Sequence, residues 1–206
     1  MTDNGGGWTL VMKINGQNST FQYSSTYWTN ATTYQPTPVD MSQAEAKYAS
    51  YSTVPFTSIL GVMEAIGNTG ADKTLVIPVA DTTSLQDLIT NTAPNTKFTS
   101  LGRTAWIDSV IPDATPQANC NLEGINVQIN YGPTCTGAFS SGDAIRIGLL
   151  TNQENDCCSP DSSTGFGAAA GTANCSGEAA VSAGTIGGNC YTGGPNVVNF
   201  GFLFVR

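Results

Sequence analysis

Several segments of the chain alternate apolar and polar residues with a period of two, the pattern of a half-buried β-strand. In residues 197–205 the alternation places Phe200, Phe202 and Phe204 on one face, so this face is expected in the core. Pro78 marks residues 75–79 as an edge strand or a strand end, because proline donates no hydrogen bond to a sheet. The segments that predict strands are residues 8–14, 75–79, 124–131, 144–150 and 197–205.

Other segments predict short helices. Ser42 and Ser84 are each followed three positions later by an acidic residue, which is the spacing of a capping box. The predicted helices are residues 42–49, 84–89 and 99–111. Residues 56–63 fit a buried strand or a short helix, and residues 21–33 fit an exposed edge strand or an aromatic loop. Residues 1–206 are therefore expected to form a single α+β domain, mostly antiparallel strands with a few short helices and long loops.

The charge of the chain excludes some partners. Only 11% of the residues are charged, and the formal net charge is −8. Nucleic-acid binding depends on clustered Lys and Arg, and the seven basic residues form no cluster in the sequence. No run of about 20 apolar residues predicts a membrane span. The first residues do not resemble a signal peptide, so a secreted chain is expected to have lost its leader.

The six cysteines predict disulfide bonds in an oxidising compartment. The chain has no histidine and no C-x-x-C pair, which argues against a zinc site. Cys120 and Cys135 flank the strand 124–131 and are the preferred pair. The remaining four allow three pairings, and we favour Cys157 and Cys158 each bonding forward, because a bond between the two neighbours would close a strained ring. These four are Cys157, Cys158, Cys175 and Cys190.

Residues 151–167 contain the densest group of oxygen-bearing side chains in the sequence. Flexible loops with carboxylate, amide and backbone oxygens are typical Ca²⁺ sites. The alternative is a solvated turn held by disulfides. The residues that make the group are Asn152, Gln153, Glu154, Asn155, Asp156 and Asp161.

Nothing in the sequence singles out an enzyme. Glu123, Glu154, Glu178 or Asp161 could supply the two carboxylates of a glycosidase, but no spacing selects a pair. Nucleophile and phosphate-binding motifs are also missing. We therefore expect a non-enzymatic protein.

Aromatic residues among polar neighbours either stack on sugar rings or pack at half-buried positions, and the sequence leaves both readings open. They are Tyr23, Tyr27, Trp28, Tyr34 and Tyr191. Tyr191 is the preferred ligand-binding candidate, together with Asn155. Arg146, inside an apolar strand, is expected to pair with a carboxylate. Three sequons predict N-glycosylation if the source is eukaryotic, at Asn18, Asn30 and Asn174.

Two segments at the ends of the chain carry a family resemblance. Asp-Asn-Gly-Gly-Gly-Trp-Thr-Leu, residues 3–10, resembles the opening signature of fibrinogen C-terminal-like domains, and residues 202–206 resemble their closing strand. Further segments resemble a branch of fibrinogen-like extracellular proteins. These are residues 84–89, 99–106, 119–126 and 146–157.

The resemblance, which extends distantly to the intelectins or X-type lectins, implies a secreted, disulfide-bonded, Ca²⁺-dependent module. It implies that Asn152 and Glu154 are the main Ca²⁺ ligands, with Asp156, Asp161 and the more distant Glu178 contributing, inside a disulfide-rich region at about 119–194. The expected function is lectin-like glycan binding in recognition or cell adhesion. The alternative is a structural subunit of an extracellular filament, coat or appendage, with a homo-oligomer as partner and Ca²⁺ only stabilising the fold.

Overall fold

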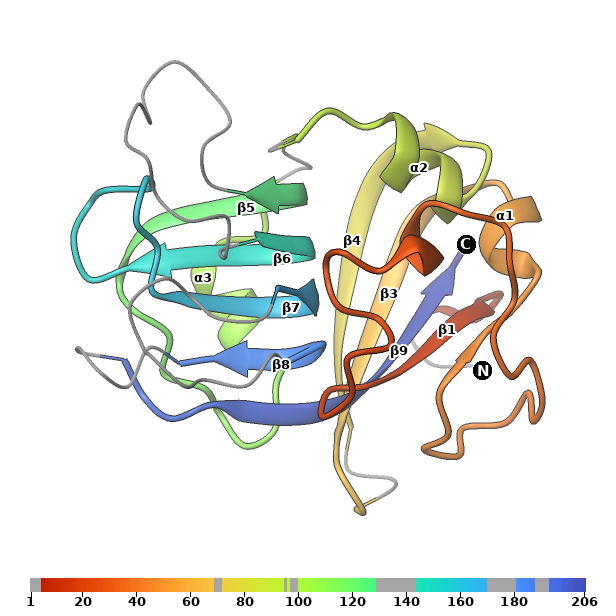
Figure 1. Cartoon of the computed structure of the whole chain (residues 1–206), viewed down its shortest axis with the longest axis horizontal. Coiled ribbons are helices and arrows are strands. Elements are labelled where there is room, and N and C mark those ends of the chain that lie inside the picture. The colour runs from red at the N-terminus through yellow and green to blue at the C-terminus, as the bar shows by residue number, and fades with distance from the viewer. Residues whose placement is uncertain are drawn as a thin grey trace.

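The computed structural model describes residues 5–68, 72–94, 96, 100–128, 144–169, 181–187 and 193–206. Within these residues the fold is largely β, with a few short helices (Figure 1). The strands are β1 Thr9–Asn15, β2 Ala46–Lys47, β3 Phe56–Ala65, β4 Asp72–Thr82, β5 Asn119–Gln128, β6 Ala144–Asn152, β7 Ser162–Ala168, β8 Ala183–Ile186 and β9 Val197–Val205. The helices are the 3₁₀ helix η2 Thr26–Trp28, α1 Ser50–Thr53, α2 Leu85–Asn91 and α3 Arg103–Ile107.

Strand β9 connects two groups of strands. Its first residues pair with β8, and its later residues lie between β1 and β3, all antiparallel. The strands therefore form one sheet in the order β2-β1-β9-β8-β7-β6-β5. Strand β3 also pairs with β9, and β4 lies beside β3. In Figure 1, β9 runs beneath β5 to β8 and then rises among β1, β3 and β4. The three phenylalanines of β9 are buried with Leu60 and Val62 of β3, which confirms the predicted core face.

Most predicted strands are confirmed, and two ambiguities are resolved. Residues 56–63 lie in strand β3, and residues 21–33 form a loop around η2. The long strand β4 includes Pro78 and, among the described residues, pairs only with β3, so its assignment as an edge is correct. Strand β1 is buried on both faces, although its alternation predicts one: the intervening Val11 and Lys13 are fully buried.

The predicted helix at residues 42–49 is wrong. Ala46 and Lys47 form the short strand β2 beside β1. The Glu45 carboxylate does not close a capping box but accepts hydrogen bonds from the Asn15 main chain and from the side chains of Asn18 and Thr20. These hydrogen bonds to another segment occupy the Glu45 carboxylate, which in a capping box would accept from the main-chain N–H of the first residue. The predicted helix 84–89 is confirmed as α2, whereas α3 is shorter than residues 99–111.

Residues 162–168 form strand β7, whereas the sequence indicates a loop through residue 167. All seven residues are buried between β6 and β8. Apart from Phe166, their side chains are small, which allows close packing but gives little alternation, and this explains why the period-two pattern misses β7 and β8. No helix in the described ranges is long and apolar enough to cross a membrane.

Candidate functional site

The buried side chain of Asn152, at the end of β6, organises the following loop. Its Nδ2 donates a hydrogen bond to the main-chain oxygen of Asp156 at 2.8 Å. Two further oxygens, Glu154 Oε2 and Ser159 Oγ, each lie 3.4 Å from the same nitrogen. Three oxygens therefore converge on an NH₂ group that carries only two hydrogens. This convergence gives loop 153–161 a defined shape around one buried amide.

The other predicted ligands of this loop have different surroundings. Glu154, Asn155 and Asp156 are exposed, and Asp156 Oδ1 accepts a hydrogen bond from the Cys158 main-chain N–H at 2.9 Å. Asp161 is buried, and its main-chain N–H donates to the Thr151 oxygen at 3.0 Å. Loop 153–161 therefore brings Glu154 and the Asp156 main chain to Asn152, whereas Asp161 lies at the start of β7.

The acidic side chains of this region do not form a dense cluster. Within the described ranges, no group of three or more His, Cys, Asp or Glu residues could hold a metal ion. A Ca²⁺ site here would therefore depend on amide and main-chain oxygens as well as carboxylates. Glu178 and Tyr191 lie outside the described residues.

A disulfide bond fixes the loop to the neighbouring strand. Cys120 is bonded to Cys157, with a Cα–Cα distance of 5.1 Å, so the preferred pair Cys120–Cys135 is wrong, and Cys157 bonds backward rather than forward. A bulge at Cys120 and Asn121, both with positive φ, interrupts the pairing of β5 with β6. Bulges re-aim side chains, and this one lies where Cys120 reaches the loop.

The neighbouring cysteines Cys157 and Cys158 bear out the prediction that they do not bond to each other. Cys157 and Cys158 are not bonded to each other, as expected, and Cys158 is itself in a disulfide bond. Cys135, Cys175 and Cys190 lie outside the described residues. The Asn119 side chain also donates to the Gln153 main-chain oxygen, so the loop is held to β5 by two kinds of bond.

Buried polar residues that no sequence motif predicted lie behind loop 153–161. The Gln117 main-chain N–H donates to Ser162 Oγ at 3.0 Å, and Ser162 Oγ lies 2.5 Å from Thr151 Oγ1. Neither polar atom of the buried Gln117 side chain has a hydrogen-bond partner among the described residues. In the sequence, the hydroxyl residues Thr151 and Ser162, on either side of residues 152–161, are the only signal of this polar interior.

The aromatic residues of the first loop pack against one another. Phe21, Tyr27 and Tyr34 make mutual edge contacts with centroid distances of 5.3–5.7 Å. Trp28 is fully buried. For Trp28 the packing alternative is therefore correct, and Tyr27 and Tyr34 are half-buried beside it.

Lys47 points into this aromatic group. Its Nζ lies 4.5 Å from the Tyr51 ring centroid and donates to the main-chain oxygen and Oδ1 of Asn30. Burial lowers the pKa of Lys47 to about 8, because a charged amine loses hydration there. The same burial raises the pKa of Tyr51. The cluster is therefore a packed interior rather than an open stacking surface.

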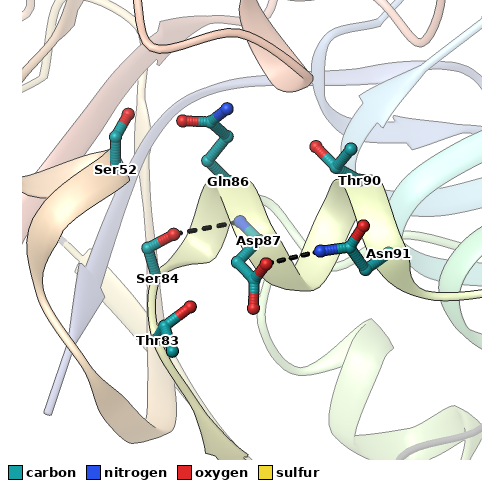
Figure 2. Close-up of a pocket in the computed structure, with 7 residues that line it drawn as sticks. All are labelled: Ser52, Thr83, Ser84, Gln86, Asp87, Thr90 and Asn91. Carbon is teal, nitrogen blue, oxygen red and sulfur yellow. Dashed lines mark hydrogen bonds between the residues drawn. The ribbon is translucent and has the colours of Figure 1, made fainter.

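A shallow pocket of about 280 Å³ lies along α2 (Figure 2). Ser84 caps this helix by accepting a hydrogen bond from the Asp87 main-chain N–H at 3.0 Å. Asp87 in turn accepts a hydrogen bond from the Asn91 side chain one turn later, as Figure 2 shows. The capping pattern predicted the helix but not the pocket. Its lining offers hydroxyl, amide and carboxylate groups, from Ser52, Thr83, Ser84, Gln86, Asp87, Thr90 and Asn91.

No carboxylate of the described residues pairs with Arg146 on β6. Its Nε donates to the Tyr23 main-chain oxygen at 2.8 Å, and its Nη1 donates to Asn126 Oδ1 at 2.7 Å. The guanidinium carbon lies 4.1 Å from the Tyr23 ring centroid. Burial lowers the pKa of Arg146 and raises that of Tyr23. The expected ion pair is thus replaced by neutral oxygens and an aromatic ring.

Two of the three sequons lie in the described part of the chain. Asn18 is exposed, and its Nδ2 donates to Glu45 Oε2 at 3.0 Å. Asn30 is partly exposed, and its Oδ1 accepts from the Thr32 main-chain N–H at 3.0 Å. Asn174 lies outside the described residues. Glycosylation therefore stays a prediction at all three positions.

Comparison with protein-family models finds no matching family, and comparison with curated proteins finds no match.

Proposed function

We propose that the protein is an extracellular, Ca²⁺-dependent recognition or adhesion module that binds glycans. The observation that carries the proposal is the convergence of Glu154 Oε2, the Asp156 main-chain oxygen and Ser159 Oγ on the Asn152 amide. The disulfide Cys120–Cys157 holds this loop against β5. Such bonds persist in oxidising compartments, which favours a secreted protein.

A rotation of the Asn152 amide would convert this arrangement into an ion site. The two ends of an asparagine amide have nearly the same shape, but only one accepts. With Oδ1 in the place of Nδ2, four oxygens from Asn152, Glu154, Asp156 and Ser159 would face one another. Ca²⁺ prefers oxygen sets of this type. The rotation would cost the hydrogen bond that Asn152 Oδ1 accepts from the Gln153 main-chain N–H at 2.8 Å, and ion binding would offset that cost.

Two features support a fibrinogen-like module. The segments that carry the resemblance at the chain ends contribute to adjacent strands, because Thr9 pairs with Val205 and Leu10 with Phe204. The described fold is mostly antiparallel with short helices, as a fibrinogen-like module requires. For glycan contact, loop 153–161 itself presents the exposed Asn155, and the polar pocket along α2 offers further hydrogen-bonding groups.

Ca²⁺ binding is tested by thermal unfolding with and without the ion. A ligand that binds only the folded state must raise the midpoint, so millimolar Ca²⁺ should raise the Tm of the wild type. Glu154→Gln should lose most of this shift. The matched control is Asp108→Asn, which removes an exposed carboxylate outside the loop. An unchanged wild-type Tm, or equal shifts in both variants, would refute the ion site.

Glycan binding needs a separate measurement. On an array of neutral glycans, the wild type should bind in Ca²⁺ and lose binding in calcium-depleted buffer, and Glu154→Gln should behave as the depleted wild type. Binding that persists without Ca²⁺ would reject ion-dependent recognition. A Tm shift with no glycan bound would leave Ca²⁺ in a stabilising role only.

The edge strand β4 favours a second candidate, a structural subunit. It pairs only with β3 within the described ranges, and residues 74–80 carry no charge. The uncharged middle of a strand at a sheet edge can accept a strand from another copy. Ordered polymers that Val76→Lys abolishes, without glycan binding, would favour this candidate. A monomer by light scattering at high concentration would exclude it.

A further inference from the structure

The Arg146 guanidinium has more hydrogen-bonding capacity than the protein uses. It has five N–H donors, and the described residues accept from two of its nitrogen atoms, through Tyr23 O and Asn126 Oδ1. The two ion pairs within the described ranges involve Lys13 with Asp40 and Lys73 with Asp113. No described carboxylate therefore pairs with Arg146, although the net charge of the chain is −8. Among the residues that the structure describes, this partly exposed cation has no anionic partner.

The neighbours of Arg146 hold the guanidinium in one position. The Asn126 side chain that accepts from it also donates to the Ile89 main-chain oxygen at 2.7 Å and to the Thr92 oxygen at 3.2 Å. Asn126 itself has a φ of 50°, a left-handed conformation that is uncommon for non-glycine residues but that asparagine adopts more readily than most. Non-glycine residues in such conformations concentrate at binding and active sites.

The strand beside Arg146 is shaped to receive its stem. Gly167 on β7 has a φ of 72°, and a Cβ there would lie 2.9 Å from Cβ and Cγ of Arg146. The same Cβ would lie 2.7 Å from Trp28 Cζ2, so a larger residue would clash both with the buried indole and with the arginine stem. The Tyr23 ring covers one face of the guanidinium at 4.1 Å. Gly167, Tyr23 and Asn126 together fix the plane of the Arg146 guanidinium. Its Nη2 atom makes no hydrogen bond to a described residue.

We propose that Arg146, framed by Tyr23 and Asn126, is a binding subsite for a carboxylate group of an external ligand. A planar guanidinium with free N–H groups matches a carboxylate with two parallel hydrogen bonds. Resting on the glycan binding proposed above, the chemical class that fits the site is a uronic acid or another acidic sugar. The subsite does not depend on Ca²⁺, because Arg146 and Asn152 lie six residues apart on β6, on the order of 20 Å along the strand.

The test uses the wild-type chain in buffer freed of Ca²⁺ by a chelating resin, since a soluble polycarboxylate chelator would compete. D-glucuronate is titrated against D-glucose, with sodium chloride matching the ionic strength. The readouts are the NMR resonance of the Arg146 Nε–H and the Tm. Glucuronate and acetate should shift both readouts, and glucose should shift neither.

Variants then assign the response to this side chain. Arg146→Lys keeps the charge but loses the planar fork, so the affinity for glucuronate should fall about tenfold. Arg146→Gln should abolish the response. Lys73→Gln removes one positive charge from an exposed ion pair and should bind as the wild type does. If an Arg146 variant fails to fold, the shift of the Arg146 Nε–H resonance in the wild type decides whether the ligand binds at this side chain.

Several results would overturn the proposal. Equal responses to glucose and glucuronate would show that the carboxylate is not recognised. A response that sodium chloride reproduces would reflect charge screening alone. A folded Arg146→Gln that still binds would place the site elsewhere, and binding of inorganic sulfate without binding of acetate would exclude a carboxylate ligand.

Discussion

Glu123 on β5 and Trp106 on α3 form a buried hydrogen bond, with Glu123 Oε2 accepting from the indole Nε1 at 2.9 Å. The other carboxylate oxygen accepts from Ser100 Oγ and from the Gly102 main-chain N–H. Both side chains are nearly inaccessible to solvent. The carboxylate thus joins α3 and the chain before it to β5, and these contacts give Glu123 a structural role.

Removing this carboxylate should destabilise the fold. Glu123→Ala removes the carboxylate that accepts from the buried Trp106 indole N–H and from the exposed Ser100 hydroxyl, so the free energy of unfolding should fall by about 2–3 kcal/mol in urea denaturation. Glu123→Gln, which keeps one acceptor oxygen, should cost less. Glu154→Ala, at an exposed position and without Ca²⁺, should change stability by about 0.5 kcal/mol or less. Equal losses for Glu123→Ala and Glu154→Ala would argue against the structural role.

The disulfide Cys120–Cys157 should contribute to stability mainly through the unfolded chain. The cysteines are 37 residues apart in sequence, and closing a loop of this length is worth about 3–4 kcal/mol in the chain-entropy account. The double variant Cys120→Ala, Cys157→Ala should therefore unfold at a lower urea concentration. A non-reduced digest analysed by mass spectrometry should contain the peptide that joins Cys120 to Cys157. A Cys120–Cys135 peptide in its place would contradict the observed pairing.

Lys47 should make stability depend on alkaline pH. Its folded pKa of about 8 lies below the ordinary 10.5, so the folded state binds fewer protons between these values. Stability therefore rises as the pH increases through this window, and the cost of the buried charge is fully present below about pH 8. Between about pH 7.5 and 9.5 the gain should be about 1–2 kcal/mol, after allowance for solvent screening.

The comparison that isolates Lys47 is a methionine substitution. Lys47→Met should remove most of this gain, measured by urea denaturation across the pH range, whereas Lys73→Met, at a more exposed lysine, should retain it. The range ends before tyrosines ionise in the unfolded chain. Because burial raises the pKa of Tyr51 in the folded state, that residue lowers stability above its unfolded pKa. Parallel pH curves for wild type and Lys47→Met would disprove the assignment.

Phe166 on β7 rests against two glycines, and this close contact should resist added volume. A Cβ on Gly61 would lie 2.7 Å from Phe166 Cε2, and one on Gly201 would lie 2.8 Å from Phe166 Cε1. Gly61→Ala should destabilise the protein by about 1–3 kcal/mol through overpacking. In a Phe166→Leu background the same substitution should cost less, as a double-mutant cycle would show. Additive costs would mean that the ring does not cause the effect.

The sequence by itself determined the elements whose pattern arises locally. The alternation around Phe200, Phe202 and Phe204 specified β9, and Ser84 with Asp87 specified the start of α2. The sequence also predicted that Asn152 and Glu154 lie close together, because the two residues are only two positions apart at the end of a strand. These features depend on neighbours in the chain.

Only the tertiary structure decided the rest, because it depends on contacts between distant residues. Ser42 and Glu45 match a helix cap in sequence, yet Glu45 binds Asn15 and Asn18 from another segment. The partner of Cys120 followed from the pairing of β5 with β6, which no cysteine spacing encodes. Arg146 was expected to find an acid, but strand order placed it beside Tyr23 and Asn126. Side-chain chemistry fixes what a residue can bind, and the packing of strands fixes what it meets.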